Sequence, residues 1–313
     1  MQIEILGAES LGVRSLCCVV KTKGRKVIID PGVALGFRRH GLLPHPVQVV
    51  ASERTRRLIE KALEDTTDIV ISHYHGDHHP LVDANPYQLS VERVANLCMR
   101  PKFWTKGTKD LSYNQARRAK VLANSLGMIL PVAEGMSDGT LIFSLPVPHG
   151  ERDRRGSSVM MTRVEEDGEV FVHASDIQML DDIAIKQILA WQPNIVLASG
   201  PPIYLPSLTL EEQEDALRRT IRVAEKVDTL ILDHHLMRSR KGEQWLDYVS
   251  PFTKHKVICA ADFMGFHRNL LEADRVFRYK KLPVPDGWHR AYAHGEIDVV
   301  SEWSDKVAQV RTR

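Results

Sequence analysis

The sequence predicts a mixed α/β domain that contains two β-sheets. Segments with strand and helix patterns alternate along all 313 residues, and an order of strand, strand, loop and helix occurs in residues 1–90 and again from about residue 140. No long linker, internal repeat or low-complexity tract divides the chain. We therefore expect one domain over residues 1–313, in which hairpins early in each half build two sheets rather than a simple series of βαβ units.

Strand patterns appear in the first half of the chain where short apolar segments lie between turn residues. The predicted strands are residues 3–6, 15–21, 26–30 and 68–72, with a hairpin turn at Lys23-Gly24 and a charged helix over residues 52–63. Residues 90–130 are predicted to be mainly helical, and a helix over 114–127 ends at Gly127. We expect a helical insertion or lid over roughly residues 80–130.

The second half continues the alternation of strands and helices. The predicted strands are residues 141–145, 157–164, 169–173, 195–198 and 229–232, and the predicted helices are residues 181–190 and 209–227. Thr209 is a suitable N-cap for the second of these helices, because Glu211 and Glu212 follow in its first turn. Ligand-type residues directly follow several of the strands, so the carboxyl ends of strands are the expected place for a site.

Composition is typical of a globular protein, with 43% hydrophobic and 26% charged residues. No apolar run reaches the roughly 18 residues that a membrane helix needs, and the N-terminus does not resemble a signal peptide. The four cysteines form no CxxC pair, and adjacent Cys17 and Cys18 on a strand would point to opposite faces. We expect buried, reduced thiols in a cytoplasmic protein. The net charge of +2 does not by itself demand a nucleic-acid partner.

Residues 73–79 hold four of the fourteen histidines of the chain and one aspartate. Imidazole is the commonest protein metal ligand, and this segment begins where the predicted strand 68–72 ends. In extended backbone His73 and His75 point the same way and suit one metal ion. Gly76 permits a sharp turn, after which Asp77 and His78 suit a second metal ion. The HxHxDH pattern therefore predicts a dinuclear metal site.

The remaining ligands of such a site are expected at other strand ends. His149 follows the predicted strand 141–145, and Asp176 follows the strand 169–173. His234 and His235 follow the strand 229–232, and the pattern leaves open which of the two is the ligand. Each residue alone fits an ordinary turn or cap, but three ligand-type positions at three strand ends are hard to attribute to chance.

The order of these motifs resembles the metallo-β-lactamase superfamily over about residues 30–235. Asp30 resembles the aspartate of its first motif, and residues 73–78 resemble the second motif. His149, Asp176 and either His234 or His235 resemble the third, fourth and fifth motifs. The segments 72–80, 173–178 and 233–236 are closest to an uncharacterised prokaryotic branch of predicted metal-dependent hydrolases. The resemblance implies a four-layer αββα sandwich of two mixed sheets packed face to face, with helices outside.

The resemblance also implies how the ligands divide between two divalent ions. His73, His75 and His149 would hold one ion, Asp77, His78 and His234 would hold the other, and Asp176 would bridge them. His234 is preferred over His235 because Arg238 follows it at the spacing seen in RNA-processing relatives. Zinc suits this donor set best, and manganese or iron would also accept it. His79 lies outside the motif and is expected to be structural.

Three residues are candidates for catalytic work beside the ions. A shared water between two metal ions becomes a nucleophile near neutral pH, and Asp77 would orient that hydroxide or accept its proton. Asp30 would hold a ligand imidazole by its other nitrogen. His235 is the third candidate, in addition to its alternative role as the fifth-motif ligand.

The substrate is less well defined by the sequence. The short segments 150–175 and 177–233 leave no room for the RNA-gripping arm or the extra domain of RNA-processing relatives. Arginine near the proposed ligands would clamp a phosphate. The candidates for this role are Arg152, Arg154, Arg155 and Arg238. We therefore predict hydrolysis of a phosphodiester or phosphorylated ester, either a small molecule or a nucleic acid.

Three other functions are compatible with parts of the pattern. An iron-containing redox protein would use the same ligand set, but no flavodoxin or rubredoxin module is fused to the chain. A lactonase or thioesterase would use the same metal chemistry. A nucleic-acid-binding protein with structural metals fits less well, because structural sites are closed by four protein ligands. No membrane association is expected, and the sequence leaves open whether the chain forms a homo-oligomer.

Overall fold

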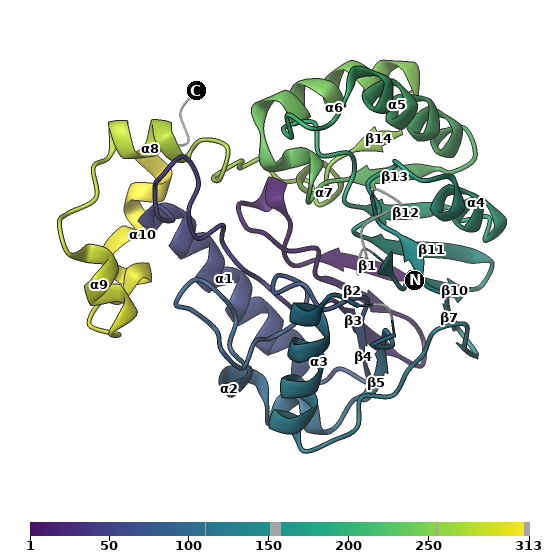
Figure 1. Cartoon of the computed structure of the whole chain (residues 1–313), viewed down its shortest axis with the longest axis horizontal. Coiled ribbons are helices and arrows are strands. Elements are labelled where there is room, and N and C mark those ends of the chain that lie inside the picture. Colours follow the sequence, from purple (N-terminus) through teal and green to yellow (C-terminus); the bar gives the residue numbers. More distant parts are fainter. Residues whose placement is uncertain (110, 151–157, 255, 310–313) are drawn as a thin grey trace.

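Two β-sheets lie at the centre of the computed structural model, which describes residues 1–109, 111–150, 158–254 and 256–309, with side chains to residue 306 (Figure 1). The first sheet has the order β1-β2-β3-β4-β5. Its strands are β1 (Gln2–Ile5), β2 (Cys18–Lys21), β3 (Lys26–Ile29), β4 (Asp68–Ile71) and β5 (Lys102–Thr105). Strands β1, β2 and β3 form an antiparallel meander, and β3, β4 and β5 are parallel.

The second sheet has seven strands in the order β14-β13-β12-β11-β10-β7-β6. Its strands are β6 (Ser137–Asp138), β7 (Leu141–Phe143), β10 (Thr162–Glu166), β11 (Glu169–Ser175), β12 (Ile195–Ala198), β13 (Thr229–Leu232) and β14 (Val257–Ile258). Strands β11 to β14 run parallel, and β6, β7 and β10 pair antiparallel. A separate hairpin pairs β8 (Val147–Pro148) with β9 (Ser158–Val159).

Alternation of side chains along the strands explains why the sheets pack face to face. Val70 of β4 and Leu197 of β12 belong to one buried cluster that contains side chains of both sheets. Ile69 and Ile71, which flank Val70, point to the other face and join a cluster that includes α1 and α3. Both faces of each sheet are therefore apolar and covered. The predicted αββα sandwich is confirmed.

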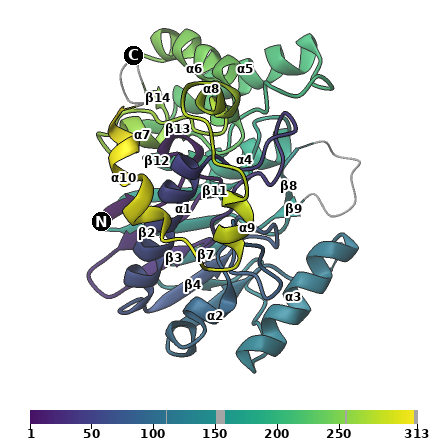
Figure 2. The ribbon, with the colours of Figure 1, turned by 90° about the vertical axis from the view of Figure 1, so that its left-hand side faces the viewer.

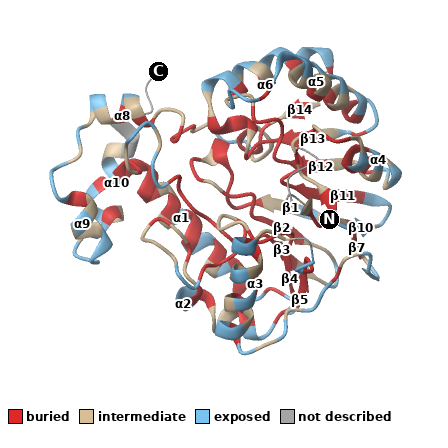
Figure 3. Cartoon of the chain, viewed as in Figure 1, coloured by how far each residue is buried: buried red, intermediate tan, exposed pale blue. Residues whose placement is uncertain are grey.

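Helices cover the outer face of each sheet (Figures 1 and 3). The first sheet is covered by α1 (Pro46–Leu63), α2 (Val91–Val94), η2 (Leu97–Met99) and α3 (Tyr113–Leu126), and the second by α4 (Asp182–Ala190), α5 (Leu210–Ala224) and α6 (Arg240–Phe252). Figure 3 shows the sheets buried and the outward faces of α5 and α6 exposed. No helix within the described residues is long and apolar enough to cross a membrane.

The C-terminal segment adds helices that the sequence analysis did not predict. They are α7 (Ala260–Phe263), α8 (Arg275–Lys281), α9 (Trp288–Ala293) and α10 (Val299–Gln309). Figure 2 shows α9 and α10 beside α1. Trp288 and Trp303 bury against the α1 side of the first sheet, so this segment closes one flank of the core.

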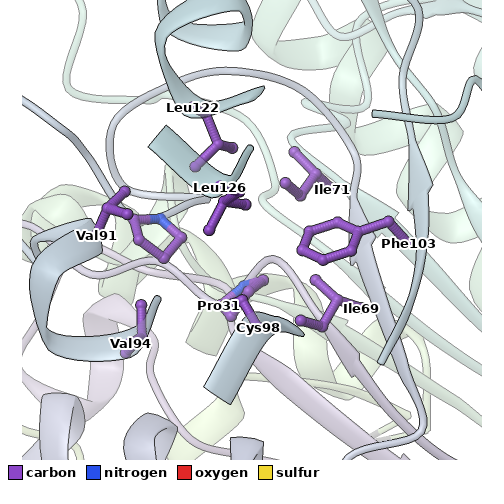
Figure 4. A pocket seen from close by; sticks show the side chains of 10 residues that line it. Pro31, Ile69, Ile71, Val91, Val94, Cys98, Phe103, Leu122 and Leu126 are labelled. Carbon is purple, nitrogen blue, oxygen red and sulfur yellow. The ribbon is translucent and has the colours of Figure 1, made fainter. Parts of the chain in front are cut away.

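A small apolar cavity lies where α2, η2 and α3 pack on the first sheet (Figure 4). Val91, Val94, Leu122 and Leu126 come from α2 and α3 and face Ile69, Ile71 and Phe103 of β4 and β5. Pro31 and Pro80, from the loops that carry the candidate site residues, complete the lining with Cys98. With no charged group in its wall, the cavity belongs to the packing that supports these loops.

Several expected boundaries differ from the structure. Residues 102–105 form strand β5 within a region predicted to be mainly helical, because Phe103 and Trp104 bury on opposite faces of the first sheet. Helix α1 begins at Pro46 rather than residue 52, with the His45 side chain accepting a hydrogen bond from Val47 N. The expected strand 157–164 is divided into β9 and β10. The single domain with an insertion over 80–130 stays a prediction.

Candidate metal centre

The candidate ligands follow three strands whose carboxyl ends meet between the two sheets. The segment 73–78 follows β4 in the first sheet, and Asp176 and His234 follow β11 and β13 in the second. In parallel sheets the carboxyl ends of strands lie along one edge. Face-to-face packing of the sheets then brings residues about 100 and 160 positions apart in sequence to a single point.

Asp176 is at the centre of this arrangement, and its two oxygens face different histidines. Oδ2 lies 3.4 Å from His73 Nε2, 3.6 Å from His75 Nδ1 and 3.2 Å from His235 Nε2. Oδ1 lies 3.2 Å from His78 Nε2 and 3.7 Å from His234 Nε2. We call these groups the Oδ2 side and the Oδ1 side. A carboxylate between two donor sets is the geometry of a bridging ligand.

Asp77 belongs to the Oδ1 side. Its Oδ2 lies 3.3 Å from His234 Nε2, and donor atoms of Asp77, His78 and His234 all lie within 4.8 Å of one another. The same holds for His73, His75 and Asp176 on the Oδ2 side. The structure thus brings together six of the seven residues proposed as ligands.

Unpartnered polar atoms inside the site fit a bound cation. His78 Nε2 and Asp176 Oδ1 are buried, yet neither has a hydrogen-bond partner although they lie 3.2 Å apart. A buried polar atom without a partner costs roughly 1–3 kcal/mol. A metal ion bound by both atoms would remove this cost, and the mixture of imidazole nitrogen and carboxylate oxygen suits zinc, iron or manganese.

His149 and His235 both lie near the Oδ2 side. The ring centroid of His149 is 5.7 Å from that of His75 and 6.2 Å from that of His73. His149 belongs to none of the close donor groups within the described residues, whereas His235 belongs to one with Asp176 and His234. Both histidines of the fifth motif therefore face Asp176, from opposite oxygens. The choice between them as ligand stays a prediction.

Asp30 lies behind the ligands. Its Oδ2 is 2.9 Å from His78 Nδ1, and it accepts hydrogen bonds from Ser72 N, Ser72 Oγ and Ser175 Oγ. A proton on His78 Nδ1 leaves Nε2 free to face Asp176, as carboxylate–histidine pairs do around metal ions. Burial raises the pKa of Asp30, but the neighbouring His78 outweighs it and lowers that pKa to about 2.

A close backbone contact holds Asp30 under His78. A Cβ atom on Gly32 would lie 2.2 Å from His79 N, so only glycine permits the turn after β3 to approach the histidine-rich loop 73–79 this closely. Asp30 itself has a φ of 52°, in the left-handed region that aspartate tolerates better than most residues. The Asp30-Pro31-Gly32 sequence is therefore part of the site, as well as the end of a strand.

The sequence analysis missed two serines. Ser72 Oγ lies 2.9 Å from His73 Nδ1 and 2.6 Å from Ser175 Oγ, and both hydroxyls also contact Asp30. Each serine directly precedes a candidate ligand, His73 or Asp176. Their positions inside the motif segments 72–80 and 173–178 were the only signal, and no pattern of spacing indicated that the two would meet.

Charge is distributed unevenly across the site. Burial lowers the pKa of His78, but the carboxylates of Asp176 and Asp30 raise it well above its usual range. Burial and the neighbouring histidines hold the pKa of His73 well below its usual range. The surroundings therefore favour the charged form of His78 and the neutral form of His73.

Of the candidate substrate-binding arginines, Arg238 lies against the site. Its Nη2 is 2.5 Å from His234 Nε2 and 3.5 Å from Asp77 Oδ2. Arg152, Arg154 and Arg155 lie outside the described residues. His79 points away from the donor atoms, with its Nδ1 2.8 Å from the carbonyl oxygen of Pro80, and is in none of the close donor groups of the described chain.

Similarity to known proteins agrees with the fold and the site. A family model described as the metallo-β-lactamase superfamily matches residues 12–79, which include Asp30 and the histidine cluster. A UPF0282 protein of Methanosarcina mazei is 53% identical over 299 residues, covering 96% of this chain and 98% of the relative. Another, from Methanopyrus kandleri, is 33% identical and covers 88% of this chain and 98% of its own length.

A solved structure described as a metal-dependent hydrolase of the β-lactamase superfamily (Tm1679) is 13% identical, with a TM-score of 0.47, and covers 82% of this chain and 94% of its own. The sequence identity to the UPF0282 proteins, which extends over nearly the whole chain, decides the assignment. The chain belongs to the UPF0282 family, a prokaryotic branch of the metallo-β-lactamase superfamily.

Proposed function

We propose that the protein is a hydrolase with a dinuclear metal site centred on Asp176. The observation that carries this proposal is the division of donors between the two Asp176 oxygens. His73 and His75 would hold one ion, with His149 or His235 as a third donor. Asp77, His78 and His234 would hold the other. We infer zinc as the metal, although iron and manganese accept the same two donor types.

The residues around the ions would prepare them for hydrolysis. A bound metal pair lowers the pKa of a shared water toward neutrality and stabilises charge that develops on the reacting group. Asp30 holds the imidazole of His78 in one orientation through Nδ1. Asp77 lies 16% exposed at the edge of the donor group, where it would accept a proton from water. His235 would donate a proton to the leaving group, the third catalytic role.

The substrate class follows from the charge beside the ligands. The Arg238 guanidinium faces Asp77 and His234, and guanidinium groups bind phosphate oxygens through two parallel donors. We therefore favour a phosphodiester or phosphorylated ester, as a small molecule or within a nucleic acid. Arg152, Arg154 and Arg155 are proposed to join in phosphate binding on the basis of the sequence alone.

Metal analysis and a substrate panel test the proposal. Protein purified without added metal should contain about two zinc ions per chain, and less than about one ion contradicts the dinuclear site. The panel should compare chromogenic phosphodiesters, phosphomonoesters, thioesters and lactones in wild type and His75→Ala. Phosphodiester hydrolysis that His75→Ala abolishes supports the proposal. Equal rates in both proteins exclude this site as the source, and iron in place of zinc would favour the redox alternative.

A further inference from the structure

Arg238 occupies an unusual position for an arginine. It ends the short helix η3 (Leu236–Arg238) and its side chain is only 9% exposed. One end of the guanidinium contacts the Oδ1 side of the metal centre through Nη2. At the other end, Nε has no hydrogen-bond partner and lies 3.6 Å from Glu9 Oε2. A buried guanidinium with incomplete hydrogen bonding is costly unless another group completes it.

The other buried acids near Arg238 are already engaged. Glu272 accepts hydrogen bonds from Arg14 and Arg39, and Asp233 accepts from the backbone N–H groups of Ser10 and Ala260. Glu9 differs, because neither of its side-chain oxygens has a hydrogen-bond partner. Glu9 is therefore the acid left to face the Nε side of Arg238, and burial together with the neighbouring Glu272 raises the pKa of its carboxyl group to about 8.

Binding of metal ions would change the contacts of Arg238 Nη2. The 2.5 Å contact requires His234 Nε2 to accept a hydrogen bond, yet that lone pair is the one a metal ion would use. With metal bound, Nη2 would lose this acceptor, and its other anionic contact in the structure is Asp77 at 3.5 Å. An oxygen anion of a bound substrate would replace the lost acceptor.

Hydrogen bonds also hold the main chain beside Arg238 and Glu9. Arg39 Nη2 donates to the carbonyl oxygen of Arg238 at 3.0 Å, and its guanidinium lies 5.1 Å from the Tyr204 ring centroid. Ser10, next to Glu9, donates through its backbone to Asp233 and accepts from Asn269. Glu9 and Glu272 both lie outside the segment 30–235 that resembles the superfamily. Part of the surroundings of Arg238 is therefore supplied by residues outside that segment.

We propose that Arg238 binds a non-bridging oxygen of the substrate phosphoryl group on the Oδ1 side, and that Glu9 is a positioning residue that holds Arg238 there. The proposal rests on the proposed function, which already assigns phosphate binding to Arg238, and adds to it the side of Asp176 on which the phosphoryl oxygen binds and the role of Glu9. A carboxylate substrate would satisfy the same guanidinium, so the test must separate the two anions.

Binding of inorganic phosphate to the metal-loaded protein tests the proposal. Titration calorimetry should compare wild type, Arg238→Lys, Glu9→Gln and the control Arg218→Gln, whose side chain is 64% exposed on α5. We expect Arg238→Lys to weaken phosphate binding at least about tenfold, because lysine cannot form the two parallel donors. Glu9→Gln should weaken it by a smaller factor, and Arg218→Gln should leave it unchanged.

Metal content and unfolding temperature are measured for each variant. If the role of Glu9 is purely structural, Glu9→Gln will have a lower unfolding temperature and the phosphate affinity of wild type. That result would overturn the positioning role. Phosphate affinity unchanged in folded, metal-loaded Arg238→Lys overturns the oxyanion role, while the metal site and the hydrolysis stand. Loss of metal in Arg238→Lys also overturns it, and acetate binding as tightly as phosphate excludes the phosphoryl assignment. If Arg238→Lys does not fold, the phosphate affinity of Glu9→Gln tests the proposal by itself.

Discussion

The two sides of Asp176 differ in charge and in access to solvent. On the Oδ2 side, Asp176 faces histidines only, and the His75 side chain is 36% exposed. On the Oδ1 side, His78 and His234 are fully buried beside the carboxylate of Asp77 and the guanidinium of Arg238. The Oδ1 side therefore offers a cation one more carboxylate than the Oδ2 side, while the Arg238 guanidinium offsets part of that charge. The Oδ2 side is the side nearer to solvent.

Replacing the shared residue should have the largest effect. Asp176→Asn removes the charge that both donor sets face, so we expect both ions to be lost and activity to fall by more than about 100-fold, since even outer partners of ligands cost 10–100-fold. Elemental analysis and the rate on the best phosphodiester would measure this. A variant that keeps two ions and full activity would show that Asp176 does not join the two sides.

Variants on single sides should separate the two ions. Asp77→Ala should weaken the Oδ1-side ion by more than about 100-fold, whereas His75→Ala should affect the Oδ2-side ion and leave the other bound. Titration with a chelator, followed by metal analysis, measures each ion. If both variants lose the same ion in the same order, the assignment of donors to sides is wrong.

Replacing Asp30, which contacts His78 Nδ1, should have a moderate effect on metal affinity. Asp30→Asn keeps the shape of the side chain but removes the charge that faces His78 Nδ1, so metal affinity should fall by about 10–100-fold. Asp65→Asn is the matched control, because Asp65 is 72% exposed and pairs with Lys26 at the surface. An equal effect of both variants would contradict a specific role for Asp30.

The smallest expected effect is on the number of protons that the protein releases when it binds metal. Since Asp176 and Asp30 raise the pKa of His78 well above its usual range, metal-free protein should carry a proton there at pH 7, and metal binding should release about one proton per chain. Calorimetry in buffers of different ionisation enthalpy measures this number. Asp30→Asn lowers the pKa of His78 and should reduce the release. Release that is the same in both proteins would place the proton elsewhere.

Local sequence patterns were sufficient to predict most strands of both sheets. The apolar segment 68–72 and the segment 229–232 could be recognised because strands buried on both faces are continuously apolar. Cys17 and Cys18 also point to opposite faces as expected, into different core clusters, and all four cysteines are buried and unpaired. Strand β5 was missed, because four residues between helical segments carry too little periodicity to distinguish strand from helix.

The sequence by itself determined the candidate ligands and their order along the chain. The HxHxDH pattern, His149, Asp176 and the paired histidines could be recognised because metal chemistry limits which side chains bind and strand ends limit where they lie. Only the tertiary structure decided that His234 and His235 face different oxygens of Asp176, that Ser72 meets Ser175 and that Glu9 lies behind Arg238. These contacts join residues about 60 to 230 positions apart, so they depend on how the two sheets and the chain ends pack, which no local pattern encodes.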